Sequence, residues 1–370
     1  MTVVESARTI LGEPVETFLV DTDVHEVMPT ADVLKPYLAP EWHRFMKYGP
    51  VLLSGLPHTQ PNQQAYRAEW QLGGGETSDR KDYGVAATSV EVVREQLLEG
   101  EGVSVAILNG FYYYSAQQGW YEQAAAMAAA YNDWQIEHWL DKEPRLRGSV
   151  HVVAHDPQKA VREIDRIGPH PQVVQVFLPV VHDREYGDPM YHPIYEAAVR
   201  NDLALCLHFG MNTQAPLGWM RYFMEWHTLA SPTASASQVV SLVANGVIDK
   251  FPVLKVVVLE AGIFWVPWLM RRFDVHYREM RVEVPWVKRL PSEHIRDNFR
   301  FATQPMEGAP REIETLCELV ESDRMFMFAT DYPHFDADSV DAALPKSLPE
   351  ELRMRIRHQN AIDTYPKLLG

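Results

Sequence analysis

Four short apolar segments of the chain each end in ionisable residues. The segments are FLVDTDVH, ALCLH, KVVVLE and MFMFATD, and the residues near their ends are Asp23, His25, His208, Glu260 and Asp331. A carboxylate or an imidazole in a dry interior is costly unless it is hydrogen-bonded, paired with an opposite charge or bound to a cation. No lysine or arginine stands at these four ends, so converging carboxylates require another source of positive charge. Mixed imidazole and carboxylate ligands suit Zn, Mn or Fe better than Mg or Ca, and we therefore expect a divalent transition-metal site.

These residues need a scaffold that brings distant segment ends together. Eight apolar, β-branched runs are separated by longer helical stretches, which is typical of a parallel sheet in α/β order. The predicted strands are 18–25, 103–109, 149–153, 173–178, 204–208, 255–260, 299–303 and 325–331. The predicted helices are 117–140, 157–167, 191–201, 235–249, 266–280, 311–321 and 350–365. Eight such units predict a (β/α)8 TIM barrel, whose active site lies at the carboxyl ends of the strands.

The segment 28–102 between the first two strands does not fit this pattern. It is rich in proline, glycine and aromatic residues. A structureless loop of that length is improbable in a compact domain. We therefore expect a single metal-dependent barrel domain over residues 1–370, with 28–102 as an inserted lid over the barrel mouth.

Alternation along a strand predicts which side chains face the barrel interior. Asp21, Asp23 and His25 are spaced two residues apart, so an unbroken strand places them on one face. His151 also stands on a predicted strand, and we interpret it as a hydrogen-bonded histidine of the core.

Composition excludes several classes of function. The 34 basic and 50 acidic side chains give a net charge of −16, which argues against nucleic acid or an anionic membrane as partner. The two cysteines cannot make a disulfide framework. No signal-peptide pattern opens the sequence, and no apolar run reaches the ~20 residues of a membrane helix. We expect a cytoplasmic protein that acts on a small molecule.

Five blocks of sequence occur in a family-specific order. They are VDTDVHE, DPMYHPIYEAAVRNDLALCLHFG, VVVLEAGIFWVPWLMRRFD, FATDYPHFD and RHQNAIDTY. Together they resemble the amidohydrolase superfamily, in particular the amidohydrolase-related branch with aminocarboxymuconate-semialdehyde decarboxylase and the resorcylate decarboxylases. The resemblance implies that one metal ion is held by Asp23, His25, His208 and Asp331. It also implies that Asp331 handles a proton of the metal-bound water or of the substrate.

Three positions depart from the pattern of that family. Asp23 stands where the first-strand motif usually has the first histidine of HxH. Glu260 stands where the sixth strand usually presents a histidine that polarises the substrate. The fourth strand, VVQVFLP, has no lysine that could be carbamylated, which argues against a carbamate-bridged pair of metals.

The surplus charge of Glu260 leaves three functions open. In the first, Glu260 is the general acid of a metal-dependent hydrolase or decarboxylase that acts on a small organic acid or amide. In the second, Glu260 and His334 hold a second metal, and the protein is an oxygen-activating non-haem Fe or Mn/Fe hydroxylase, alone or within a hetero-oligomer. In the third, the chain is a non-catalytic, metal-bearing partner subunit.

Residues after the strands are candidates for contact with the substrate. We expect Asn109 and Gln304 to supply polar contacts and Tyr112, Trp219 and Trp265 to form apolar walls. The tryptophans of the predicted helix 117–140 favour assembly into a homo- or hetero-oligomer, as is usual in the resembled family.

Overall fold

All eight predicted strands are present in the computed structural model, which describes residues 18–29, 31–43, 87–110, 120–180, 184–209, 223–334 and 337–369. They form one parallel sheet in the order β1 to β8. The strands are β1 (Val20–Val24), β2 (Val105–Leu108), β3 (Leu146–His151), β4 (Val173–Pro179), β5 (Ala204–His208), β6 (Val256–Leu259), β7 (Phe299–Ala302) and β8 (Phe326–Met327). Every residue in these strands is buried, which explains why the sequence shows continuous apolar runs.

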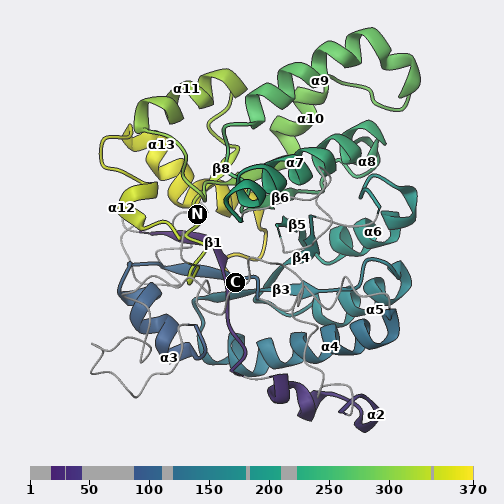
Figure 1. Cartoon of the computed structure of the whole chain (residues 1–370), viewed down its shortest axis with the longest axis vertical. Helices are drawn as coiled ribbons and strands as arrows, with labels where there is room; N and C mark the ends of the chain where they lie inside the picture. The colour runs from purple at the N-terminus through teal and green to yellow at the C-terminus, as the bar shows by residue number, and fades with distance from the viewer. Residues whose placement is uncertain are drawn as a thin grey trace.

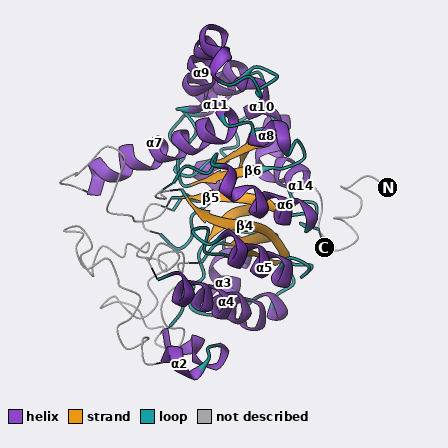
Figure 2. Ribbon diagram, turned by 90° about the vertical axis from the view of Figure 1, so that its right-hand side faces the viewer, coloured by secondary structure: helices purple, strands orange, loops and turns teal. Residues whose placement is uncertain are grey.

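The sheet closes between its first and last strands. The backbone N–H of His25 donates to Tyr332 O at 2.8 Å, and that of Asp331 donates to Asp23 O at 3.0 Å. The predicted (β/α)8 barrel is therefore confirmed, with the strands at the centre and helices around them (Figures 1 and 2). Closure brings the ends of β1 and β8 together, although about 300 residues separate them in sequence.

The predicted helices are confirmed with shifted bounds. Between the strands lie α4 (Tyr121–His138), α5 (Pro157–Ile167), α6 (His192–Arg200), α7 (Phe223–Ala244), α8 (Val247–Lys250), α9 (Val266–Met280), α10 (Pro291–Asn298) and α11 (Pro310–Val320). After β8 come α12 (Val340–Ala343), α13 (Glu350–Met354), the π-helical η10 (Arg355–Gln359) and α14 (Asn360–Thr364). Short 3-10 turns are η7 (Leu140–Lys142), η8 (Pro189–Tyr191) and η9 (Arg281–Glu283).

Two helices differ from the prediction in ways that matter below. In the described residues α7 begins at Phe223, twelve positions before the predicted start at 235. Its first part projects beyond the strands (Figure 2). Helix α10 was not predicted, because its sequence PSEHIRDN has little apolar periodicity and runs directly into β7.

Two apolar layers hold the barrel together. The larger layer lies between the strands and the helices and includes Val258, Phe301 and Ile164. The smaller one fills the barrel interior and includes Cys206, Phe177 and Met327. The interior layer leaves the carboxyl ends of the strands to polar residues.

Only part of the expected lid, 28–102, lies within the described residues. That part contains η1 (Ala31–Tyr37), α2 (Pro40–His43), α3 (Val90–Val93) and η5 (Arg94–Glu99). Tyr37 Oη donates to Glu137 Oε2 at 2.6 Å, so η1 packs against α4. The single-domain organisation and the lid remain predictions. No helix in the described part of the chain is long and apolar enough to cross a membrane.

Candidate metal centre

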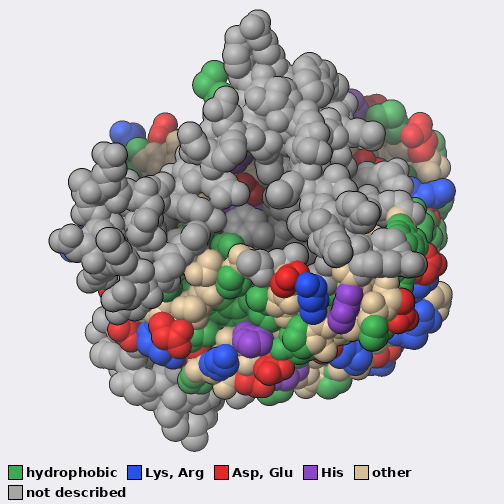
Figure 3. Space-filling model, turned by 60° about the horizontal axis from the view of Figure 1, so that its bottom comes forward, with side chains coloured by type: hydrophobic (Ala, Val, Ile, Leu, Met, Phe, Trp, Pro, Cys, Tyr) green, Lys and Arg blue, Asp and Glu red, His purple; other side chains and the backbone are tan. Residues whose placement is uncertain are grey.

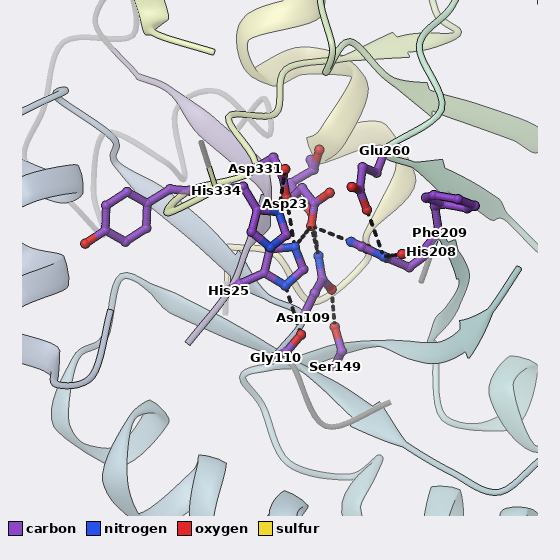
Figure 4. Close-up of polar contacts among 12 residues, drawn as sticks. Asp23, His25, Asn109, Gly110, Ser149, His208, Phe209, Glu260, Asp331 and His334 are labelled. Atoms are coloured by element: carbon purple, nitrogen blue, oxygen red, sulfur yellow. Dashed lines mark hydrogen bonds and ion pairs between the residues drawn. The ribbon is translucent and has the colours of Figure 1, made fainter. Parts of the chain in front are cut away.

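Four of the predicted ligands meet at the carboxyl end of the barrel. Ligand atoms of Asp23, His25, His208 and Asp331 all lie within 4.8 Å of one another, and the four side chains are fully buried (Figure 4). His25 Nε2 lies 2.9 Å from Asp331 Oδ1, and His208 Nε2 lies 3.3 Å from Asp23 Oδ1. We call these four residues the first cluster.

Backbone carbonyl groups orient the two histidines of the first cluster. His25 Nδ1 donates to Gly110 O at 2.9 Å, and His208 Nδ1 donates to Phe209 O. With its proton on Nδ1, each neutral imidazole presents the lone pair of Nε2 toward the carboxylates. A hydrogen bond of this kind is the usual support of a metal-ligating histidine.

The buried carboxylates of the first cluster need a positive charge nearby. Burial alone would lower the pKa of His25. The carboxylates of Asp23 and Asp331 outweigh burial and raise this pKa to about 10. Burial raises the pKa of Asp23, but His208 and His25 bring it below its ordinary value. Protons on the histidines therefore balance the carboxylates when no other cation is bound, and a metal ion would take the place of those protons.

The carboxylates supply further signs of a fit to a metal. Asp23 Oδ2 is buried and makes no hydrogen bond in the described structure. A buried carboxylate oxygen without a hydrogen bond is costly unless a cation binds it. Two carboxylate oxygens and two imidazole nitrogens form a donor set suited to Zn, Mn or Fe.

Asn109 uses its whole hydrogen-bonding capacity to hold Asp23 in place. Its Nδ2 donates to Asp23 Oδ1 at 2.7 Å and to Thr22 O at 3.2 Å. Its Oδ1 accepts from Ser149 Oγ at 2.7 Å and from Gln175 Nε2 at 2.8 Å. Two donors and two acceptor sites are thereby filled, so the structure gives Asn109 a supporting role, and its contact with substrate stays a prediction.

Glu26 supports His25 indirectly, through Gly110. Its carboxylate accepts from Gly110 N at 2.9 Å, Tyr131 Oη at 2.5 Å and Gln135 Nε2 at 2.5 Å. Gly110 is the residue whose carbonyl accepts from His25, so Glu26 fixes that turn. Burial raises the pKa of Glu26.

Asp21 lies outside the first cluster, contrary to the expectation of one shared face. The register between β1 and β2 shifts between Asp21 and Val24, which breaks the alternation of side chains. The Asp21 carboxylate accepts from Thr330 N at 3.0 Å and from Thr330 Oγ1 at 2.6 Å. It therefore holds β1 against the segment that follows β8.

A second cluster lies beside the first. Ligand atoms of Glu260, Asp331 and His334 lie within 4.8 Å of one another. Glu260 follows β6 directly, and its Oε1 lies 3.4 Å from Nε2 of His227, a residue of α7. Sequence reasoning missed His227, because the first part of α7 was not predicted.

Of the four other residues predicted to contact the substrate, two lie within the described residues and two lie outside them. Trp265 packs edge-on against Phe301 at 5.4 Å, on the helix side of β7, and its Nε1 donates to Ala261 O at 2.9 Å. Gln304 is fully buried just after β7. Tyr112 and Trp219 lie outside the described residues. The roles of all four stay predictions.

His151 differs from its expected role as a hydrogen-bonded core histidine. It ends β3, stacks on Phe177 at 4.8 Å and meets Tyr131 edge-on. Neither ring nitrogen has a hydrogen-bond partner among the described residues. Burial lowers its pKa to about 3, and the neighbouring His208 and His25 add to this effect, so the ring is neutral.

In Figure 3, acidic and histidine side chains are visible near the centre of the view. Acidic, basic and apolar side chains are intermixed over the described surface in the lower part of the view.

Comparison with known proteins identifies the family. The amidohydrolase family model Amidohydro_2 matches residues 90–367. A gamma-resorcylate decarboxylase of Polaromonas sp. (strain JS666 / ATCC BAA-500) is 25% identical over 252 aligned positions, which cover 63% of this chain and 74% of that relative. The chain therefore belongs to the amidohydrolase family, as the sequence motifs predicted.

Solved structures share the fold over nearly the whole chain. The 5-carboxyvanillate decarboxylase of Sphingomonas paucimobilis superposes with a TM-score of 0.72 at 20% identity, covering 95% of this chain and 99% of that one. A dihydroxybenzoic acid decarboxylase of Polaromonas sp. JS666, solved with bound manganese and the inhibitor 2-nitroresorcinol, gives 0.67 at 18% identity, covering 95% and 96%. These likenesses confirm the barrel.

Proposed function

We propose that this protein is a metal-dependent decarboxylase of a small hydroxylated aromatic acid. The observation that carries the proposal is the first cluster, whose four buried side chains form a ligand set for one divalent ion. The relatives named above are decarboxylases of resorcylate, carboxyvanillate and dihydroxybenzoate, which supports decarboxylation over hydrolysis and indicates the substrate class.

The metal would be held by Asp23, His25, His208 and Asp331. When bound, a divalent ion supplies a Lewis acid that polarises a substrate oxygen. Asn109, Gly110 and Glu26 keep the ligands in place through the hydrogen bonds described above. Preorganised ligands need no rearrangement when the substrate binds.

The chain supplies the proton that replaces the departing carboxyl group. The bond between the ring carbon and the carboxyl carbon breaks, carbon dioxide leaves, and the ring carbon takes a proton. Burial raises the pKa of Asp331, with His25 opposing the rise, and Asp331 is the first candidate to supply that proton. His334 Nδ1 lies 2.6 Å from Asp331 Oδ2 and can return that proton. Glu260 is the second candidate acid.

Carbon dioxide release tests this function. Purified protein, depleted of metal and reloaded with Mn²⁺, is incubated with 2,6-dihydroxybenzoate (gamma-resorcylate) or with 5-carboxyvanillate, and the carbon dioxide released and the decarboxylated phenol formed are measured. We expect turnover that chelation abolishes and Mn²⁺ restores. Metal-independent turnover, or none with any hydroxylated aromatic acid, contradicts the proposal.

A dinuclear oxygen-activating hydroxylase is the second candidate, and the second cluster is the observation that favours it. Such an enzyme consumes oxygen when given a reductant and substrate, whereas a decarboxylase does not need oxygen. A non-catalytic subunit would show neither activity and would co-purify with another chain. Oligomeric assembly and a cytoplasmic location remain predictions.

A further inference from the structure

A chain of buried hydrogen bonds runs through the barrel interior from the residue after α14 to the first cluster. It begins at Tyr365, whose Oη donates to Gln175 Oε1 at 2.9 Å. Gln175 Nε2 donates to Asn109 Oδ1 at 2.8 Å, and Asn109 Nδ2 donates to Asp23 Oδ1 at 2.7 Å (Figure 4). These four residues are no more than 1% exposed, so bulk water does not compete for the three hydrogen bonds.

We propose that Tyr365 is a positioning residue for the metal ligand Asp23, and that this chain couples the docking of residues 365–369 to metal binding. We call residues 365–369 the C-terminal segment. The inference rests on the metal centre of the proposed function and is independent of the reaction performed there.

The three hydrogen bonds all point toward Asp23. An ionised carboxylate only accepts hydrogen bonds, so Asn109 has to turn its amide N–H toward Asp23 and its carbonyl oxygen toward Gln175. Gln175 then has to present its own N–H to Asn109, and its carbonyl oxygen needs a donor from elsewhere. Tyr365 Oη is that donor. Each group thus has one orientation that satisfies it, and hydrogen bonds arranged in such a chain strengthen one another.

Gln175 holds Asn109 by two routes. The first is the direct bond to Asn109 Oδ1. The second passes through Ser149, whose Oγ accepts from Gln175 Nε2 at 2.9 Å and donates to Asn109 Oδ1 at 2.7 Å. Removal of the Tyr365 hydroxyl leaves the Gln175 carbonyl oxygen buried without this donor, which favours rotation of the amide. Rotation of Gln175 disturbs Asn109 by both routes, and Asn109 in turn positions Asp23.

The C-terminal segment reaches Gln175 only when it is docked in the barrel. Tyr365 and Leu368 both belong to the apolar layer that fills the barrel interior. Arg147, near the start of β3, donates from Nε to Leu368 O at 2.7 Å and fixes the segment there. Coupling between two sites is reciprocal. The docked segment therefore raises metal affinity, and bound metal stabilises the docked segment.

Removal of one hydroxyl tests the proposal. The metal-free full chain is titrated with Mn²⁺, and free Mn²⁺ is measured by electron paramagnetic resonance. We expect Tyr365→Phe to bind Mn²⁺ about 3–10-fold more weakly than the wild type, less than the ~10–100-fold loss typical of a residue that touches the metal ligand itself. Tyr195→Phe is the matched control and should bind as the wild type does, because Tyr195 is equally buried but donates to Tyr186 O outside the barrel.

A double variant shows whether the effect passes through Asn109. In Asn109→Ala the chain is already cut, so the further change Tyr365→Phe should lower Mn²⁺ affinity no more. Additive losses overturn the coupling. So does a Tyr365→Phe affinity equal to that of the wild type, which leaves the metal centre itself in place if Asn109→Ala binds more weakly. If the wild type binds no Mn²⁺, the metal centre and the coupling both fail.

Hydrogen exchange separates positioning from a role in the fold alone. Because the coupling is reciprocal, saturating Mn²⁺ should slow amide exchange in the C-terminal segment of the wild type by about the same 3–10-fold factor. Tyr195→Phe should show the same slowing, whereas Tyr365→Phe should show little. Equal slowing in Tyr365→Phe and the wild type would mean that the hydroxyl serves the fold only, and the proposal would be overturned.

Discussion

Glu260 and Asp331 both follow a barrel strand, and both have a left-handed backbone, with φ angles of 52° and 63°. Residues other than glycine adopt this conformation at a cost, and functional sites are where it is commonly kept. At Asp331 the conformation is held by hydrogen bonds from its own N–H to Asp23 O and from His334 N to its carbonyl. In both residues the turn of the backbone places a carboxylate in the second cluster.

Asp331→Asn should abolish turnover with little change in fold. Asparagine tolerates the left-handed conformation at least as well as aspartate, so the backbone should persist. The charge that binds metal and the carboxyl group that supplies the proton are lost. Because proton transfer alone contributes about 10²–10⁴-fold, we expect kcat/KM to fall at least 10³-fold, with lower metal content.

Steady-state kinetics and metal analysis of the same preparation check this expectation. Circular dichroism serves as the control for folding. A variant with wild-type turnover would remove Asp331 from the mechanism.

Asn109→Ala should weaken metal binding without removing a ligand. Loss of a residue that orients a metal ligand typically lowers metal affinity by about 10–100-fold. Titration of metal-free protein with Mn²⁺ measures the change. Asn360→Ala is the matched control, because Asn360 is equally buried and donates to Asp323 O and Phe326 O at the other end of β8. Equal affinities in the two variants would contradict the role assigned to Asn109.

Glu26→Gln should loosen the turn that orients His25. Glutamine has one acceptor oxygen, so it cannot accept from Gly110, Tyr131 and Gln135 as the carboxylate does. Leaving a buried donor unsatisfied costs about 1–3 kcal/mol, and we expect a loss of that size in urea unfolding. Metal affinity should fall as well, whereas a variant with lower stability and unchanged affinity would show that Glu26 serves the fold alone.

The sequence predicted the fold well because strands buried on both faces have continuous apolar runs. It also predicted the first cluster, since side chains that end parallel strands of a barrel must converge. It could not predict the break in alternation at Asp21, which arises from the register with β2. Nor could it predict His227, whose place beside Glu260 depends on where α7 passes over the strands.

The hydrogen-bond partners within the barrel could not be predicted from the sequence either. The network of Asn109, Ser149 and Gln175 joins three strands, and the choice of partners depends on the stagger of those strands. In the sequence, nothing distinguishes Glu26 from any other acidic residue that follows a strand. The fold shows that two of its hydrogen-bond donors, Tyr131 and Gln135, come from α4.

Glu143, which precedes β3, should make the free energy of unfolding depend on pH. Its side chain is 4% exposed and accepts from Arg145 Nε and Arg94 Nε, both at 2.9 Å. Burial alone would raise the pKa of Glu143. The two arginines outweigh burial and lower this pKa to about 2. Between pH 4.5 and pH 2, the carboxylate of Glu143 binds a proton more readily in the unfolded chain than in the folded chain. The stabilisation is therefore complete above about pH 4.5 and is lost as the pH falls toward 2.

Glu143→Gln removes this dependence. At about 1.4 kcal/mol per pKa unit, and allowing for the partial exposure of both arginines, we expect a loss of about 2 kcal/mol at neutral pH. Urea unfolding of wild type and variant from pH 7 to pH 3 should show the difference narrowing as the pH falls. Glu99→Gln, which removes an exposed carboxylate 3.8 Å from Arg145, is the control and should run parallel to the wild type. A constant gap between Glu143→Gln and the wild type over this range would show that titration of Glu143 does not contribute to acid unfolding.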